Sequence, residues 1–283
     1  MRWRSSRRSS NIEDRRSVGG TSAKVGGVGL ILMLLVAWFM GASPSQLIGM
    51  ATNNMMSGGG SNQGTHPASA AEQESAEFVS AVVAQTEDVW KPLFRQAGLN
   101  YREPKLVLFS DQVQSACGFA SAASGPFYCP GDQKIYIDLA FFNELRRMGA
   151  PGEFARAYVI GHEVAHHVQK QLGISTKVSR LQRQSSQRES NALSVRLELQ
   201  ADCLAGVWAH HAHQQFNILE QGDIESGLQA ASSIGDDRLQ RAAGRRVNPD
   251  SFTHGTSQQR VEWFTTGLKT GDMNRCDTFG GTI

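Results

Sequence analysis

The pattern of apolar positions divides this 283-residue chain into four segments. An arginine-rich leader occupies 1–24, and an uncharged apolar run follows at 25–42. The next stretch, 43–75, lacks periodicity and is dense in Gly, Ser and Asn, so we expect a flexible linker. Regular periodicity begins near residue 76 and continues to the end, which predicts that 76–283 is the folded domain.

Helical spacing dominates this predicted domain, and short apolar or alternating segments interrupt it. The short segments are separated by glycine and proline, as strands of a small sheet would be. The fold predicted from this pattern is α+β, mainly helical with a small β-sheet. The predicted elements are helices from about Ala76 to an end near Pro92 and Gly98, over 152–172 and over 196–208, and strands over 105–110 and 134–139.

The apolar run at 25–42 has the character of a short transmembrane helix. At ~1.5 Å per residue it would extend ~27 Å, close to the ~30 Å of a bilayer's hydrocarbon core. Because a basic flank stays in the cytoplasm, we predict a single-pass membrane anchor with the folded domain on the extracytoplasmic side, in the periplasm or outside the cell. A cleaved signal peptide and a buried helix of a soluble domain are the alternatives.

Charge and cysteine content narrow the picture further. The formal net charge is +2, and it includes the arginine-rich leader, so the rest of the chain is close to neutral. Nucleic acid is therefore not an expected partner. Cys117 and Cys129 bracket a glycine- and proline-containing loop, which favours a disulfide in an exported domain, and pairing of Cys203 with Cys276 follows by elimination. Four reduced cysteines are the alternative.

The candidate chemistry lies in the segment VIGHEVAHHVQ at 159–169. His162 and His166 are four residues apart on a predicted helix, so both rings project from one face at a spacing that suits a single zinc ion. Glu163 is not placed to bind that ion, but it can reach a water beside it and take its proton. His167 is rotated by ~100° from His166, so we predict a packing or hydrogen-bonding residue.

A catalytic zinc site requires a third protein ligand. Glu198 and Asp202 lie four apart on one face of the apolar helix at 196–208, and a buried acid pair favours a cation. We therefore predict Glu198 as the third ligand and Asp202 as the acceptor that fixes the tautomer of a ligand histidine. The alternative ligands are His210, His211, His213 and His254.

Together these motifs resemble the putative neutral zinc metallopeptidase family, bacterial membrane-anchored proteins of the gluzincin type. The resemblance extends from about Ala76 to the end, and it implies a zinc-dependent endopeptidase with Glu163 as the catalytic acid/base. It also implies His162, His166 and Glu198 as the zinc ligands. The segments that carry it are CG at 117–118, GPFYCP at 125–130, IYID at 135–138, AYVIGHEVAHHVQ at 157–169, ELQADC at 198–203 and THGTSQQR at 253–260.

The predicted activity is hydrolysis of a protein or peptide substrate by zinc-activated water, with Glu163 as general base and then general acid. His254 is predicted to donate to the developing oxyanion, with Arg260 or Tyr158 as alternatives, and anchoring of its own loop is an equal possibility for His254. Two other functions compete with this one. They are a zinc-fold binding or scaffold module and a hydrolase of a non-peptide amide.

Overall fold

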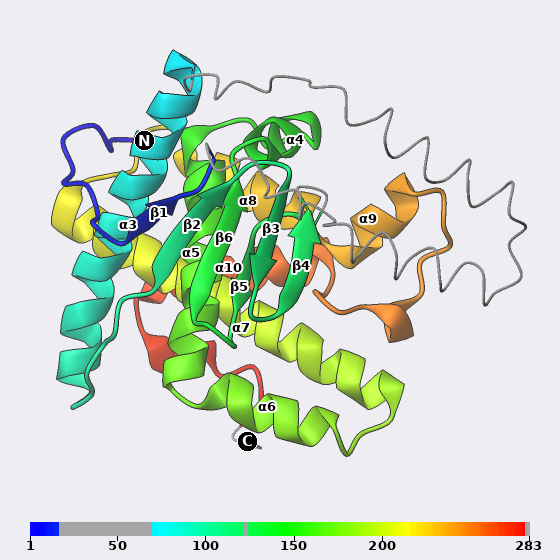
Figure 1. Ribbon diagram of the computed structural model, residues 1–283. Helices are drawn as coiled ribbons and strands as arrows, with labels where there is room; N and C mark the ends of the chain where they lie inside the picture. The colour runs from blue at the N-terminus through cyan, green and yellow to red at the C-terminus, as the bar shows by residue number, and fades with distance from the viewer. Residues whose placement is uncertain (17–68, 122–123, 281–283) are drawn as a thin grey trace, which may run out of the picture. The chain divides into compact units, whose positions relative to one another are not determined.

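The computed structural model describes residues 1–16, 69–121 and 124–280 (Figure 1). Residues 1–14 and the chain from Ser69 onward form one compact unit. Within the described residues the helices are α3 (Ala70–Gln96), α4 (Phe141–Arg147), α5 (Glu153–Gln171), α6 (Ile174–Gln182), α7 (Gln187–Phe216), α8 (Asp223–Ser233), α9 (Asp236–Ala242) and α10 (Ser257–Thr270), with 3-10 turns η2 (Pro249–Ser251) and η3 (Met273–Cys276). The strands are β1 (Ile12–Asp14), β2 (Lys105–Phe109), β3 (Gln112–Ser115), β4 (Gly118–Ser121), β5 (Phe127–Cys129) and β6 (Lys134–Asp138).

A four-stranded sheet in the order β1-β2-β6-β5 forms one layer of the fold. β1, β2 and β6 are parallel, whereas β5 runs antiparallel to β6 and forms an edge. Successive side chains of a strand point to opposite faces. Leu106 and Leu108 of β2 therefore join the main core, while Val107 joins a smaller core together with Val113 of the β3–β4 hairpin.

The long helices α5, α7 and α10 lie behind the sheet, and α3 runs beside its β1 edge (Figure 1). α7 and α10 cross with almost no space between their backbones. Gly206 and Gly267 face the crossing, and a Cβ at either position would overlap the backbone of the other helix. This close approach brings the first turn of α10 to the middle of α7, where the predicted acidic pair lies.

The mainly helical fold with small sheets agrees with the prediction, and α5, β2 and β6 fall within the predicted segments. α3 differs, because it begins at Ala70 and continues through Pro92 to Gln96. Ser69 and Glu72 form a reciprocal capping box that starts the helix. Residues 69–75 are therefore not linker, and the remainder of the predicted linker lies outside the described residues.

The start of the chain also differs from the expectation of a separate leader. Residues 12–14 pair in parallel register with residues 106–108, so the leader supplies an edge strand of the domain's own sheet. Trp3 is buried, and its ring meets that of Phe78 edge-on at 5.4 Å between centroids. Met1 and Trp3 thus belong to the hydrophobic core, while the arginines around them stay exposed.

The prediction of a single-pass membrane protein is wrong. It required the leader and the domain to lie on opposite sides of a membrane, whereas β1 and β2 are hydrogen-bonded neighbours in one sheet. In addition, none of the helices in 1–16, 69–121 and 124–280 has the length and apolar character needed to cross a bilayer. The apolar run at 25–42, on which the prediction rested, lies outside the described residues.

Candidate metal centre

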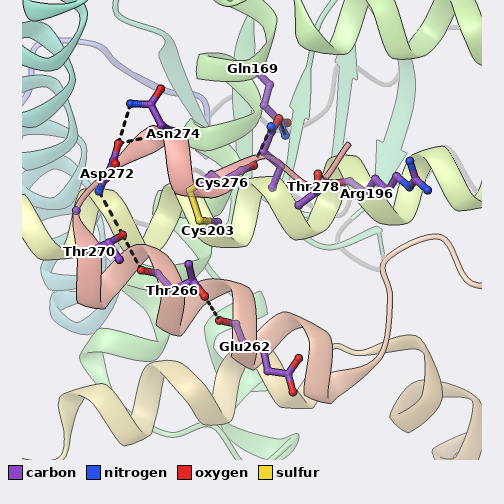
Figure 2. The surroundings of a disulfide bond; sticks show 12 residues. Gln169, Arg196, Cys203, Glu262, Thr266, Thr270, Asp272, Asn274, Cys276 and Thr278 are labelled. Atoms are coloured by element: carbon purple, nitrogen blue, oxygen red, sulfur yellow. Dashed lines mark hydrogen bonds between the residues drawn. A yellow bond between two sulfur atoms is a disulfide. The ribbon is translucent and has the colours of Figure 1, made fainter. Parts of the chain in front are cut away.

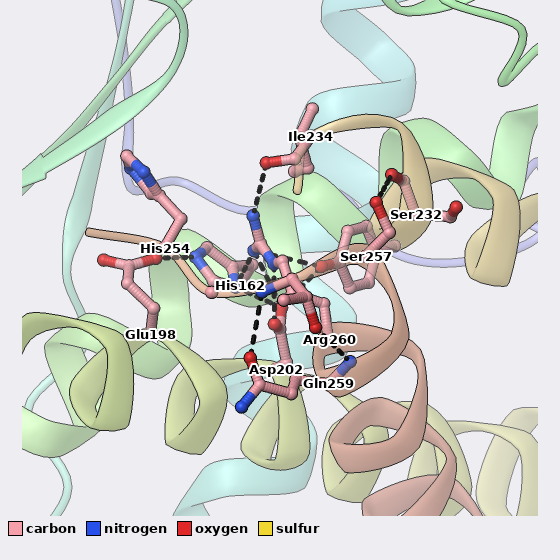
Figure 3. Close-up of polar contacts among 12 residues, drawn as sticks. His162, Glu198, Asp202, Ser232, Ile234, His254, Ser257, Gln259 and Arg260 are labelled. Atoms are coloured by element: carbon pink, nitrogen blue, oxygen red, sulfur yellow. Dashed lines mark hydrogen bonds and ion pairs between the residues drawn. The ribbon is translucent and has the colours of Figure 1, made fainter. Parts of the chain in front are cut away.

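Helices α5 and α7 bring together three side chains that could hold a metal ion, those of His162, His166 and Glu198. Figure 3 shows two of them, His162 and Glu198, in contact. Glu198 Oε2 lies 3.1 Å from His162 Nε2, and Glu198 Oε1 lies 3.3 Å from His166 Nε2. Bonds of ~2.1 Å to a tetrahedral zinc ion place ligand atoms about 3.4 Å apart. The three donor atoms of this group lie within 4.8 Å of one another, so the residues fit one zinc ion.

Asp202 lies one turn beyond Glu198 on α7 and contacts the far side of His162. Its Oδ1 atom accepts a hydrogen bond from His162 Nδ1 at 2.9 Å. Arg260, from α10, donates to both carboxylate oxygens, and the hydroxyl of Tyr158 also donates to Oδ1. Because the Nδ1 atom of His162 is held by this carboxylate, its Nε2 atom faces Glu198 and the position of the metal.

In the metal-free site the pKa values of His162, Glu198 and Asp202 all differ strongly from their usual values. Burial alone would lower the pKa of His162, but the carboxylates of Asp202 and Glu198 outweigh it and raise that pKa to about 10. Burial alone would raise the pKa of Glu198, yet His166 and His162 hold it well below its usual value. Arg260 and His162 likewise overcome burial and lower the pKa of Asp202 to about 2. In the metal-free site a protonated imidazole therefore balances the charge of the carboxylates, as a bound cation would.

His166 has a different outer partner, which the sequence interpretation did not identify. Its Nδ1 atom lies 2.9 Å from Oε1 of Gln169, a buried residue one turn further along α5. The adjacent His167 points away from the metal centre. Its Nε2 atom donates to the Arg102 carbonyl at 2.7 Å and its Nδ1 atom accepts from the Tyr128 hydroxyl at 3.0 Å, so it is a hydrogen-bonding residue.

A cleft of about 560 Å³ opens at His162, His166 and Glu198, and both Glu163 and His254 line it. No described residue donates a hydrogen bond to the Glu163 carboxylate, although its side chain is largely buried. His254 is held by Asp236, whose Oδ2 atom accepts the backbone N–H groups of Thr253, His254 and Gly255 and whose Oδ1 atom lies 3.2 Å from His254 Nδ1. Asp236 was not identified from the sequence, and it anchors the loop that presents His254.

The alternative third ligands lie elsewhere. His210 and His211 donate to the carbonyls of Leu268 and Gly271 near the end of α10, and His213 accepts the backbone N–H of Leu219. None of these three belongs to the cluster of potential metal ligands found among the described residues. These histidines instead form hydrogen bonds with backbone groups near the ends of helices α7 and α10.

Both predicted disulfides are confirmed. Cys117 is bonded to Cys129, which ties the β3–β4 hairpin to β5. Cys203 of α7 is bonded to Cys276 of η3, and Figure 2 shows this bond between α7 and the C-terminal segment. The second disulfide therefore lies on the same helix as Glu198 and Asp202.

An H-E-x-x-H helix facing a glutamate on a second helix defines the class of zinc metalloproteins with a two-histidine, one-glutamate site. The chain belongs to the putative neutral zinc metallopeptidase family, whose model matches residues 1–279. Zinc is accordingly the cofactor of this site. The match begins at residue 1, in agreement with the leader's place in the sheet.

Related proteins carry no assigned activity in their names. The chain is 48% identical over 294 aligned positions to the uncharacterized protein YpfJ of Escherichia coli K12, with both chains covered in full. It is 44% identical over 202 positions to the uncharacterized proteins Rv2575 of Mycobacterium tuberculosis H37Rv and Mb2605 of Mycobacterium bovis, which covers 68% of this chain and 66% of each of those proteins. No solved structure matches the chain.

Proposed function

We propose that the protein is a zinc-dependent endopeptidase in which His162, His166 and Glu198 hold the metal and Glu163 is the catalytic acid/base. One observation carries the proposal: the Glu163 carboxylate and the three metal-binding side chains line a single cleft. A structural zinc site has no need of an unpartnered carboxylate beside its ligands, and it is normally closed by a fourth protein ligand. The fold is then that of a zincin-like catalytic domain.

Glu163 supplies the proton transfers in this proposal. Zinc, when bound, acts as a Lewis acid toward the scissile carbonyl and lowers the pKa of water in the cleft. The Glu163 carboxylate takes a proton from the attacking water and returns it to the amine that leaves. Asp202 keeps Nδ1 of His162 protonated during these steps, so that Nε2 remains available as a ligand atom.

His254 is the proposed donor to the carbonyl oxygen of the substrate. Its Nδ1 atom is bonded to Asp236, which leaves Nε2 as the atom available to a substrate in the cleft. The hydrogen bond to Asp236 raises the pKa of His254 against the opposing effect of burial, so a larger fraction of the ring carries a positive charge. A cationic N–H donor stabilises the negative charge that develops on that oxygen.

Arg260 and Tyr158, the alternative donors, fit another role better. Arg260 uses Nε and Nη2 on Asp202, and its Nη1 atom donates to the Ile234 carbonyl at 3.3 Å. The Tyr158 hydroxyl is likewise directed at Asp202. We assign both to holding Asp202 in place beneath His162.

An extended peptide is the proposed substrate, because an edge strand borders the cleft. Among the described strands β5 pairs with β6 alone, and its residues Phe127 and Tyr128 line the cleft. The free edge of such a strand offers backbone N–H and C=O groups to an extended segment of another chain. A small non-peptide amide would make no use of this edge.

The test is to compare the wild type with Glu163→Gln on an unfolded protein and on quenched fluorescent peptides. Glutamine keeps the size of the side chain but cannot take the proton, so hydrolysis should fall by more than about 100-fold while zinc content and melting temperature stay unchanged. Glu262→Gln is the matched control, because Glu262 is exposed on α10 and accepts a hydrogen bond that glutamine can also accept. Wild-type zinc loading without any hydrolysis that depends on Glu163 would refute the proposal.

A further inference from the structure

A buried chain of hydrogen bonds runs from His166 to the Cys203–Cys276 disulfide. Gln169 Oε1 lies 2.9 Å from His166 Nδ1, and Gln169 Nε2 donates to Gln200 Oε1 at 3.0 Å. Gln200 Nε2 in turn donates to the Cys276 carbonyl at 3.0 Å. Gln169 and Gln200 are at most 7% exposed, so water does not compete for these bonds.

The direction of every bond in this chain follows from its last member. The Cys276 carbonyl can only accept, so the amide nitrogen of Gln200 must face it and the Gln200 oxygen must face Gln169. Gln169 also donates to the Leu197 carbonyl at 2.7 Å, a second acceptor that holds its nitrogen on the same side. Its oxygen is therefore left for His166, whose Nδ1 atom must be the donor.

This polarity fixes the chemical form of a metal ligand. A neutral imidazole with its proton on Nδ1 has its lone pair on Nε2, which is the atom that faces Glu198. The opposite tautomer would place two acceptors, His166 Nδ1 and Gln169 Oε1, against each other. For His162 the carboxylate of Asp202 keeps the proton on Nδ1 directly. For His166 the side-chain amides of Gln169 and Gln200 together keep the proton on Nδ1.

The disulfide holds the end of this chain of hydrogen bonds in place. Cys276 lies in η3, and its bond to Cys203 joins that segment covalently to α7, the helix that carries Glu198 and Gln200 (Figure 2). The Thr278 hydroxyl adds a second attachment by donating to the Arg196 carbonyl at 2.7 Å. The Cys276 carbonyl thus has a set position relative to the metal-binding residues.

We propose that Gln169 and Gln200 are positioning residues for the zinc ligand His166, and that the Cys203–Cys276 disulfide sets the zinc affinity of the site through them. The inference rests on the metal site of the proposed function, and it concerns metal affinity rather than catalysis. Gln169 acts on His166 directly, whereas Gln200 and the disulfide act through Gln169. Loss of any of these groups should weaken zinc binding. The loss of Gln169 should weaken it most, and the loss of Gln200 or of the disulfide should weaken it less.

Zinc dissociation constants, measured by competition with a chromophoric chelator, test the two glutamines. Loss of an outer partner of a metal ligand typically costs about 10- to 100-fold in affinity, so Gln169→Met should fall in that range and Gln200→Met should show a smaller loss in the same direction. The cobalt(II)-substituted Gln169→Met protein should also show a shifted visible absorption spectrum. Gln85→Met is the matched control, because Gln85 is a similarly buried glutamine on α3 that donates to Ser6 and not to Gln169, Gln200 or Cys276.

The two disulfides provide a second matched pair. Replacing both Cys203 and Cys276 by alanine should weaken zinc binding, while replacing both Cys117 and Cys129 by alanine should not, although each variant loses one crosslink. All measurements are made well below the melting temperature of each variant. Wild-type affinity and an unchanged cobalt spectrum in Gln169→Met would overturn the inference, as would equal affinities in the two disulfide variants. A wild type that binds no zinc would instead refute the metal site itself.

Discussion

Arg260 meets Asp202 through two parallel hydrogen bonds, Nε to Oδ2 at 2.8 Å and Nη2 to Oδ1 at 2.9 Å. Both side chains are buried, and the Oδ1 atom that accepts from Arg260 also accepts from His162. The ion pair between α7 and α10 therefore ends directly on His162, a candidate metal ligand. It links the stability of the helix crossing to the geometry of the site.

Arg260→Met should destabilise the metal-free protein by about 3–5 kcal/mol, because it leaves the buried Asp202 carboxylate without its cation. The free energy of unfolding from urea denaturation measures this loss. Arg241→Met is the control: its ion pair with Asp237 leaves the Arg241 side chain 64% exposed, and such pairs contribute less than about 1 kcal/mol. Equal, small losses in both variants would contradict the assigned role of Arg260.

Glu198→Ala should lose most of its zinc, whereas His254→Ala should retain it. Glu198 contacts both histidine Nε2 atoms, while His254 is bonded to Asp236 across the cleft. Metal content after dialysis distinguishes the two variants. If His254→Ala loses the metal and Glu198→Ala keeps it, the assignment of the third ligand fails.

The pairing of candidate site residues within each helix was predictable because helical geometry alone fixes it. His162 and His166, and likewise Glu198 and Asp202, are four residues apart, so each pair shares a helical face whatever the rest of the fold does. Gln169 could have been found in the same way, since it lies three residues after His166 on the same helix. The capping box at Ser69 and Glu72 was also a readable signal.

Other features depend on contacts between distant segments, which spacing along the chain does not reveal. Arg260 reaches Asp202 only because α7 and α10 cross at Gly206 and Gly267. Asp236 anchors the His254 loop from a separate helix. β1 has three residues and no apolar alternation, so its place in the sheet could not be inferred from its own sequence.

Zinc binding should release protons at neutral pH. The His162 pKa of about 10 means that this ring is doubly protonated in the metal-free site, whereas a ligand must offer a free Nε2 lone pair. At least one proton should therefore leave at pH 7, and the affinity should rise about tenfold per pH unit between roughly pH 7 and 9. Calorimetry in buffers of different ionisation enthalpy counts the protons, and a count of zero would contradict the pKa shift.

The same shift predicts how the stability of the metal-free protein depends on pH. The pKa of His162 is raised on folding from 6.5 to about 10, so protonation favours the folded state. This contribution is complete below about pH 6.5 and is lost as the pH rises through about 10. The midpoint of urea denaturation of the metal-free wild type should fall across that range, and His162→Gln should remove much of this dependence.

Arg7→Met should destabilise the protein much more than Arg8→Met, although the two arginines are adjacent in the leader. Arg7 donates to Glu87 at 2.7 Å, and the Glu87 side chain is only 2% exposed, so its loss leaves a buried carboxylate without a cation. Arg8 approaches Glu77 at 3.8 Å in an ion pair whose side chains are 36% and 50% exposed. We expect losses of about 2–4 kcal/mol for Arg7→Met and less than about 1 kcal/mol for Arg8→Met in urea denaturation. Indistinguishable midpoints for the two variants would show that the leader does not pack on the domain as described.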